Sequence, residues 1–209
     1  MSFVLSFRRP QPVVYKSVDQ ILNEEPGVKW TSYIPIEDRP IQYLEIGCHK
    51  GTHVQQIARS YCQHPDSKIY CIDPWEDYDE YPEYKTQQET IFQIFQTSIE
   101  PHKDKCKVIR GFSEEEVPYF EDEFFDIIYI DGNHETDYVY RDAILSLQKV
   151  KKGGYLVFDD YYVGAWDSVV KGVDMFLSDY KHRIEVIAKP TDCLQKYGHS
   201  PQVIVRRSS

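Results

Sequence analysis

The sequence predicts an open α/β fold in which helices cover a seven-stranded, mostly parallel sheet with an antiparallel pair at one end. From residue 41 onward, short apolar runs alternate with amphipathic stretches of helix length, which is typical of strand-helix-strand units. The connection between the last two apolar runs, residues 189–201, is too short for a helical crossover, so these strands are expected to be antiparallel. The 209 residues are enough for one domain with a substantial core.

Seven short apolar runs are the expected strands, and four amphipathic stretches are the expected helices. The strands are predicted over residues 41–46, 68–72, 107–110, 126–130, 155–159, 183–188 and 202–206. The helices are predicted over residues 52–62, 86–99, 136–150 and 165–179, because apolar residues recur in each at helical spacing. Gly153 and Gly154 are expected to end the third helix and to start the fifth strand.

The beginning of the chain differs in character from the rest. Residues 1–38 contain four prolines and no long periodic run. We therefore expect an N-terminal extension over residues 1–38 and a single domain over residues 39–209. The extension is expected either to cover the site as a lid or simply to pack against the domain.

The composition indicates a soluble, cytoplasmic protein. Acidic residues outnumber basic ones by 34 to 24, and the net charge of −10 disfavours nucleic acid and anionic membranes as partners. No apolar run is long enough for a membrane span or a signal peptide. The five cysteines form no C-x-x-C pair and are odd in number, as expected of free thiols in a reducing compartment. The composition is also compatible with a homo-oligomer.

Polar residues follow four of the expected strands, and ligands bind beyond these carboxyl ends in open α/β sheets. The first strand leads into the turn EIGCHKG, residues 45–51, which lacks the G-x-G-x-x-G spacing of dinucleotide sites and therefore favours a ligand without a pyrophosphate. A tight turn that needs glycine only for its backbone is the alternative. Asp73 ends the second strand, where a carboxylate can accept hydrogen bonds from ribose hydroxyls.

The ordered set of motifs from about residue 40 to the C-terminus resembles the class I S-adenosylmethionine-dependent methyltransferases. The matching motifs are LEIGCHKG, IDP, VIRGFSEE, FFDIIYIDGNH and VKKGGYLVFDDY. The resemblance implies a Rossmann-like, doubly wound sheet of order 3-2-1-4-5-7-6 with helices on both faces. It also implies that S-adenosylmethionine is the cofactor, with the glycine turn at its methionine part, the second strand end at its ribose and the loop after the third strand at its adenine. By position, the cofactor-binding residues are Glu45, Gly47, Cys48, Gly51, Asp73, Gly111, Phe112, Ser113 and Asp131.

Three aspartates at neighbouring strand ends predict a metal site. Asp131 ends the fourth strand, and Asp159 and Asp160 follow the fifth. Carboxylates this close together raise one another's pKa, and a hard divalent cation such as Mg²⁺ removes that conflict. His134, three residues after Asp131, is the expected general base for an acceptor hydroxyl, with Asp131 as its catalytic neighbour. An ordinary Asp-Gly turn and a solvated pair of loop aspartates are the alternatives.

The motifs DGNH and DDY are most similar to those of the metal-dependent sugar O-methyltransferases of the macrocin and mycinamicin type. This resemblance implies Mg²⁺-dependent methylation of a sugar hydroxyl, free, nucleotide-linked or within a glycan. It assigns Asp131, Asp159 and Asp160 to the metal and His134 to the proton. Catechol-type enzymes, the alternative, typically have Asp-Asn where this chain has Asp-Asp.

Two other functions stay open at this point, namely a non-catalytic S-adenosylmethionine-binding module and an oxidoreductase that uses a nicotinamide cofactor. The absence of G-x-G-x-x-G disfavours the oxidoreductase. Contacts to a small-molecule or glycan acceptor are expected from the aromatic and acidic segment 75–89 and from Tyr161, Tyr162 and Trp166. A solvated loop is the alternative for that segment.

Overall fold

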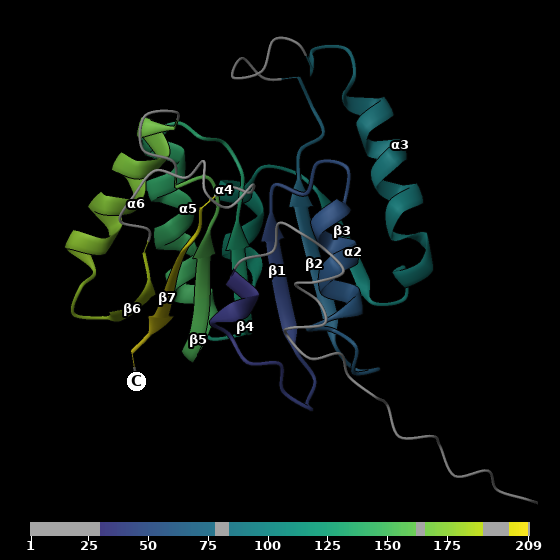
Figure 1. The fold of residues 1–209 in the computed structure, drawn as a ribbon. Coiled ribbons are helices and arrows are strands. Elements are labelled where there is room, and N and C mark those ends of the chain that lie inside the picture. Colours follow the sequence, from purple (N-terminus) through teal and green to yellow (C-terminus); the bar gives the residue numbers. More distant parts are fainter. Residues whose placement is uncertain (1–29, 78–83, 162–165, 190–200, 209) are drawn as a thin grey trace, which may run out of the picture.

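The structure, a computed structural model, describes residues 30–77, 84–161, 166–189 and 201–208 (Figure 1). Several predictions concern residues outside these ranges. They include the lid formed by the first part of the chain, the centre of the segment 75–89, Tyr162 and the connection between the last two strands. These stay predictions.

A single seven-stranded sheet forms the centre of the domain. Its order is β3-β2-β1-β4-β5-β7-β6, and the pairs β5–β7 and β6–β7 are antiparallel while the others are parallel. The predicted fold class, strand order and antiparallel end are therefore confirmed. The strands are β1 (Gln42–Ile46), β2 (Lys68–Asp73), β3 (Cys106–Arg110), β4 (Phe125–Ile130), β5 (Val150–Phe158), β6 (Ile184–Ala188) and β7 (Val203–Arg207).

Helices cover both faces of the sheet (Figure 1). Adjacent residues of one strand point to opposite faces, and Tyr43 and Leu44 accordingly belong to two different core clusters. The cluster with Tyr43 contains α2 and α3, and the cluster with Leu44 contains α5 and α6. The helices are α2 (Thr52–Arg59), α3 (Gln88–Ile99), α4 (Ser113–Glu116), α5 (Thr136–Lys149) and α6 (Asp167–Asp179), with short 3₁₀ turns at η1 (Trp30–Ser32), η3 (Glu100–His102) and η4 (Val117–Tyr119).

The two glycines after α5 do not end that helix, contrary to our prediction. The helix ends at Lys149, and β5 begins immediately at Val150, so Gly153 and Gly154 lie inside the strand. The pairing of β4 with β5 shifts here, because Phe125 pairs with Val150 whereas Ile127 pairs with Tyr155. Glycine is needed for this bulge, since Gly153 has a φ of 78° and a Cβ on Gly154 would lie 2.8 Å from the Asp126 carbonyl oxygen.

Packing of the domain begins before residue 39. Trp30 is fully buried and stacks on Tyr61 with ring centroids 4.7 Å apart, and Ile34 belongs to the same core cluster. The backbone N–H of Trp30 donates to Gln202 Oε1 at 2.9 Å, which ties this segment to the residue before β7. Trp30 and Ile34 are thus part of the domain core.

Within the ranges that the structure describes, no helix is both long enough and apolar enough to cross a bilayer.

Candidate active site

A cavity of about 370 Å³ opens at the carboxyl ends of β1, β2, β3 and β4. Strand order reverses between β1 and β4, which is where open α/β sheets bind ligands. Its walls come from the turn after β1, the end of β2, the loop after β3 and the start of α5. The predicted residues that line it are Gly47, Asp73, Gly111, Phe112, Ser113, Asp131, His134 and Asp160.

The turn after β1 is held by the strand ends beside it. Gly47 has a φ of 85°, and a Cβ at this position would lie 1.9 Å from the Asp131 carbonyl oxygen. Gly51 has a φ of 77° and precedes α2, where a Cβ would press against the Phe95 ring at 2.9 Å. Both glycines are therefore required by the backbone, and Gly47 also leaves the cavity open beside Asp131.

Asp73 is the carboxylate that organises this turn. Its Oδ2 accepts hydrogen bonds from the backbone N–H groups of Cys48 at 2.9 Å and His49 at 2.8 Å, and its Oδ1 accepts one from Trp75 at 2.8 Å. Burial raises the pKa of Asp73, although these three N–H groups favour the charged form. Asp73 thus lines the cavity with its carboxylate already oriented.

Glu45 and Cys48, two predicted cofactor ligands, have side chains that do not line this cavity. The Glu45 carboxylate is 2% exposed and lies 2.8 Å from His53 Nδ1 and 3.0 Å from the Tyr43 hydroxyl. The Cys48 thiol is buried, which raises its pKa to about 12. The backbone N–H of Cys48 reaches the site through Asp73. The main chain of Cys48 thus helps to orient Asp73, and a contact between Cys48 and the cofactor stays a prediction.

The loop after β3 meets α5 at the other end of the cavity. The Ser113 hydroxyl donates a hydrogen bond of 2.6 Å to Asp142 Oδ1. Asp142 is only 2% exposed, and burial raises the pKa of its carboxyl to about 7. Sequence reasoning missed Asp142, although it lies three residues after Val139 and therefore on the buried face of the helix. A polar residue at an apolar position of the pattern was the available signal.

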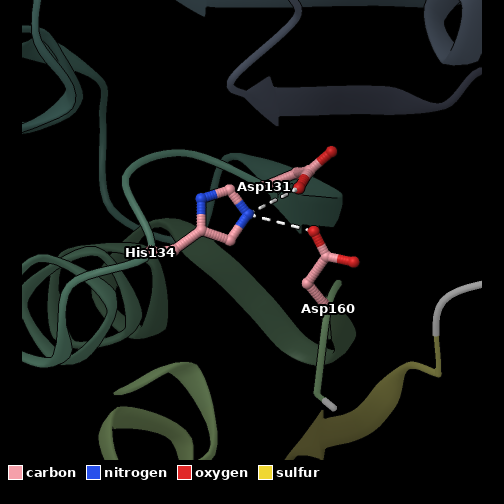
Figure 2. A group of neighbouring side chains, drawn as sticks. All are labelled: Asp131, His134 and Asp160. Atoms are coloured by element: carbon pink, nitrogen blue, oxygen red, sulfur yellow. Dashed lines mark hydrogen bonds and ion pairs between the residues drawn. The ribbon is translucent and has the colours of Figure 1, made fainter. Parts of the chain in front are cut away.

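Asp131, His134 and Asp160 come together at the edge of the cavity (Figure 2). His134 Nε2 lies 3.0 Å from Asp160 Oδ2 and 3.9 Å from Asp131 Oδ1. One potential ligand atom from each of the three residues lies within 4.8 Å of the others. The three side chains point toward one another from the end of β4, the turn before α5 and the end of β5 (Figure 2).

Asp159, the third predicted metal ligand, is not part of this group and accepts hydrogen bonds from neighbouring residues. Its Oδ2 accepts a hydrogen bond of 2.5 Å from the Tyr129 hydroxyl, and its Oδ1 accepts bonds from the Gln202 amide at 3.2 Å and the Asp160 backbone N–H at 2.9 Å. The Gln202 amide also donates to the Tyr129 oxygen at 2.8 Å. Three donors therefore occupy the two oxygens of Asp159, and its assignment to the metal stays a prediction.

The electrostatics of the site favour a cation. Burial and the charges of Asp159 and Asp160 raise the pKa of Asp131 well above its usual range. Burial and the charge of Asp160 also raise the pKa of Asp159. The two carboxylates of Asp131 and Asp160 offer oxygen donors that suit a hard divalent ion, and its charge would remove this repulsion. The residues present thus fit a metal.

An unusual backbone conformation and a stacked aromatic ring lie next to His134. Asp160 has a φ of 51°, a left-handed conformation that is uncommon outside glycine and often occurs at functional sites. The Trp166 ring stacks on the His134 ring with centroids 4.6 Å apart and an interplanar angle of 28°. Asn133 had no predicted role, and its Oδ1 accepts a hydrogen bond of 2.8 Å from the Glu135 backbone N–H, just before α5.

Two residues of the segment 75–89, which is predicted to contact the acceptor, line the cavity. Tyr84 and Gln88, both in the segment 75–89, line it, whereas Trp75 is fully buried against Phe92 and Phe95. Tyr161 is also buried, with its hydroxyl donating to Asp174 at 2.9 Å. Only part of the predicted acceptor segment therefore faces the site.

The sheet order and the cavity at its switch point define the fold of the class I methyltransferases. Residues 44–161 match a methyltransferase domain family. The chain belongs to that family, which confirms the class of enzyme expected from its motifs.

Solved structures share the fold at low sequence identity. The O-methyltransferase TomG from Streptomyces achromogenes, in complex with SAM, is 15% identical, with 80% of this chain and 73% of that one covered and a TM-score of 0.60. An O-methyltransferase from Bacillus cereus, in complex with SAH, is 15% identical over 92% and 90% of the two chains, with a TM-score of 0.61. An rRNA methylase from Streptococcus thermophilus is 13% identical over 83% and 90%, with a TM-score of 0.59.

One curated relative matches over a short stretch. Protein R132 of Acanthamoeba polyphaga mimivirus is 42% identical over 55 residues, which are 26% of this chain and 25% of that protein. The match thus spans about a quarter of that relative's length.

Proposed function

We propose that the protein is an S-adenosylmethionine-dependent O-methyltransferase that uses Mg²⁺ or another hard divalent cation and methylates a sugar hydroxyl. The observation that carries this proposal is the convergence of Asp131, His134 and Asp160 on one edge of the cavity that the glycine turn also lines. The O-methyltransferases of the same fold, crystallised with SAM or SAH, support the reaction class.

Each part of the chain has a distinct task in this proposal. The turn at Gly47, the Asp73 carboxylate and the loop from Gly111 to Ser113 bind the cofactor, which supplies an electrophilic methyl group. Asp131 and Asp160 hold the cation, which lowers the pKa of an acceptor hydroxyl when it is bound. His134 Nε2 faces both carboxylates and takes the hydroxyl proton. Much of the rate enhancement then comes from the positioning of the acceptor oxygen against the methyl carbon.

The proposal of a sugar acceptor rests on the pattern of DGNH followed by DDY and on aromatic and polar groups that line the cavity. Tyr84 and Gln88 line it and offer a ring for a sugar face and an amide for its hydroxyls. The negative charge of the protein argues against RNA, although an rRNA methylase has the same fold.

The decisive experiment is incubation with S-adenosylmethionine labelled in the methyl group, Mg²⁺ and separate panels of nucleotide sugars, glycans, catechols and RNA. Label in a sugar fraction supports the proposal, and label in a catechol or an RNA alone overturns the sugar assignment. We expect excess chelator to stop transfer of the labelled methyl group and added Mg²⁺ to restore it. Undiminished transfer in chelator would rule the cation out.

Variants separate binding from chemistry. Asp131→Asn, His134→Gln and Asp160→Asn are each expected to lower turnover by about 100-fold or more, while affinity for S-adenosylhomocysteine changes little. Asp137→Asn is the matched control, because it replaces the same side chain by the same amide. Asp137 lies three residues after His134, in the first turn of α5, where its side chain is exposed. Full turnover in the His134 variant would contradict its assignment as the base.

A further inference from the structure

We propose that Asp142 recognises the exocyclic amine of the cofactor's adenine and thereby selects adenine over a 6-oxo purine. The inference rests on the proposed use of S-adenosylmethionine and goes beyond it, because it assigns base specificity to a residue of α5 that has no role in the proposed function.

The position of Asp142 in the cavity carries the argument. Its side chain lines the same wall as Gly111, Phe112 and Ser113, the loop assigned to adenine. The Ser113 hydroxyl donates to Oδ1 at 2.6 Å, which holds the carboxyl plane in one orientation. Asp142 Oδ2 lies over Gly132, where a Cβ would come within 3.2 Å of it. A side chain on residue 132 would therefore crowd this oxygen.

The second oxygen has no partner within the chain. Among the residues that the structure describes, no group donates a hydrogen bond to Asp142 Oδ2, although the residue is 2% exposed. The nearby guanidinium of Arg141 forms an ion pair with Glu114, with Nη2 2.8 Å from Oε1, and its Nη2 and Nε donate no hydrogen bond to Asp142. Buried carboxylates are costly unless their oxygens accept hydrogen bonds, so Oδ2 is an acceptor that awaits a donor from the cavity.

The chemistry of the purine edge selects the donor. Adenine presents an N–H₂ group at position 6, which can donate to Oδ2. A 6-oxo purine presents a carbonyl oxygen there, which would leave two acceptors facing each other in a buried site. Sites built around a buried hydrogen bond reject a ligand that lacks the matching group far more strongly than apolar pockets reject a change of size.

The test compares the binding of S-adenosylhomocysteine with that of S-inosylhomocysteine, its 6-oxo analogue, by titration calorimetry at about pH 9, where the Asp142 carboxyl, with its pKa of about 7, is ionised and can only accept. The wild type is expected to prefer the adenosyl ligand by about 100-fold. Asp142→Asn adds an N–H donor in the same volume, so this variant is expected to lose about 10-fold in adenosyl affinity and to gain inosyl affinity. Its preference should fall below about 10-fold.

Glu114→Gln is the matched control. Glu114 is another carboxylate on the cavity wall, but its Oε1 is paired with Arg141, so this variant is expected to keep the preference of the wild type. A preference that is unchanged in Asp142→Asn, or lost instead in Glu114→Gln, would overturn the inference. An equal loss of affinity for both ligands in a folded Asp142→Asn protein would also overturn the inference, because it would show that Asp142 only positions Ser113. Binding of neither ligand by the wild type would overturn the proposed function itself.

Discussion

Gly47 lies directly against the backbone of Asp131, and a Cβ on Gly47 would come within 1.9 Å of the Asp131 carbonyl oxygen. The backbone N–H of Asp131 in turn donates to the carbonyl of Ile46 at 2.9 Å. The turn after β1 and the end of β4 are therefore in contact. This contact sets the position of Asp131 relative to the turn assigned to the cofactor.

Gly47→Ala is expected to destabilise the protein by about 3 kcal/mol or more, because it adds a clash with backbone to a φ of 85°. Gly153→Ala is the control, since Gly153 has a φ of 78° but its Cβ would meet nothing closer than Arg206 Nη2 at 3.5 Å. This variant should cost only about 1 kcal/mol. Urea unfolding measures both losses, and equal losses would contradict the contact.

Asp142 is expected to make stability depend on pH. Its folded pKa of about 7 lies above the usual value of 3.8, so its folded carboxyl binds a proton that the unfolded chain has already released. This stabilisation is complete below about pH 4 and is lost as the pH rises to about 7. Relative to Asp142→Asn, the wild type should lose up to about 4 kcal/mol of unfolding free energy over that range. Urea unfolding of both proteins at pH 4.5 and pH 8 would show it, and a constant difference would refute the raised pKa.

The hydrogen bond from Tyr129 to Asp159 is expected to contribute to stability at neutral pH. Tyr129→Phe leaves a buried carboxylate without one of its donors, and a loss of about 1–3 kcal/mol is expected. Tyr140→Phe removes a similar bond of 2.7 Å to Asp179 on the exposed surface and should cost less than about 0.5 kcal/mol. Thermal unfolding of the two variants at pH 7 makes the comparison. If Tyr140→Phe lost as much stability as Tyr129→Phe or more, the buried hydrogen bond to Asp159 would not be a special source of stability.

The Trp166 ring is expected to position the His134 imidazole rather than to bind the cofactor. Trp166→Ala removes the stacked ring 4.6 Å away and should lower kcat about 10-fold, with S-adenosylhomocysteine affinity unchanged. Tyr119→Ala serves as the control because Tyr119 is 85% exposed. Steady-state kinetics with calorimetry would decide, and a loss of cofactor affinity equal to the loss of kcat would argue against a positioning role.

The strand ends were predictable because hydrophobic runs end where a strand leaves the core, and the residue that follows must lie at the edge of the sheet. Asp73, Asp131 and Asp160 were located at that edge in this way, and the structure places all three on the cavity. The bulge at Gly153 was not predictable in the same way. Whether a glycine pair ends a helix or kinks a strand depends on the partner strand, here the carbonyl of Asp126.

The sequence by itself determined the order of elements, the antiparallel end and the carboxylates that gather at one edge, because periodicity and connection length are local properties of the chain. Only the tertiary structure decided which side chains face the cavity. Asp159 and Asp160 are neighbours in sequence, yet Asp160 lines the cavity, whereas Asp159 is held by hydrogen bonds from Tyr129 and Gln202, 30 and 43 residues away. Glu45 is likewise held by His53, and Asp142 is buried against Ser113. The contacts of Asp159 and Asp142 join distant segments, so they depend on packing that no local pattern contains.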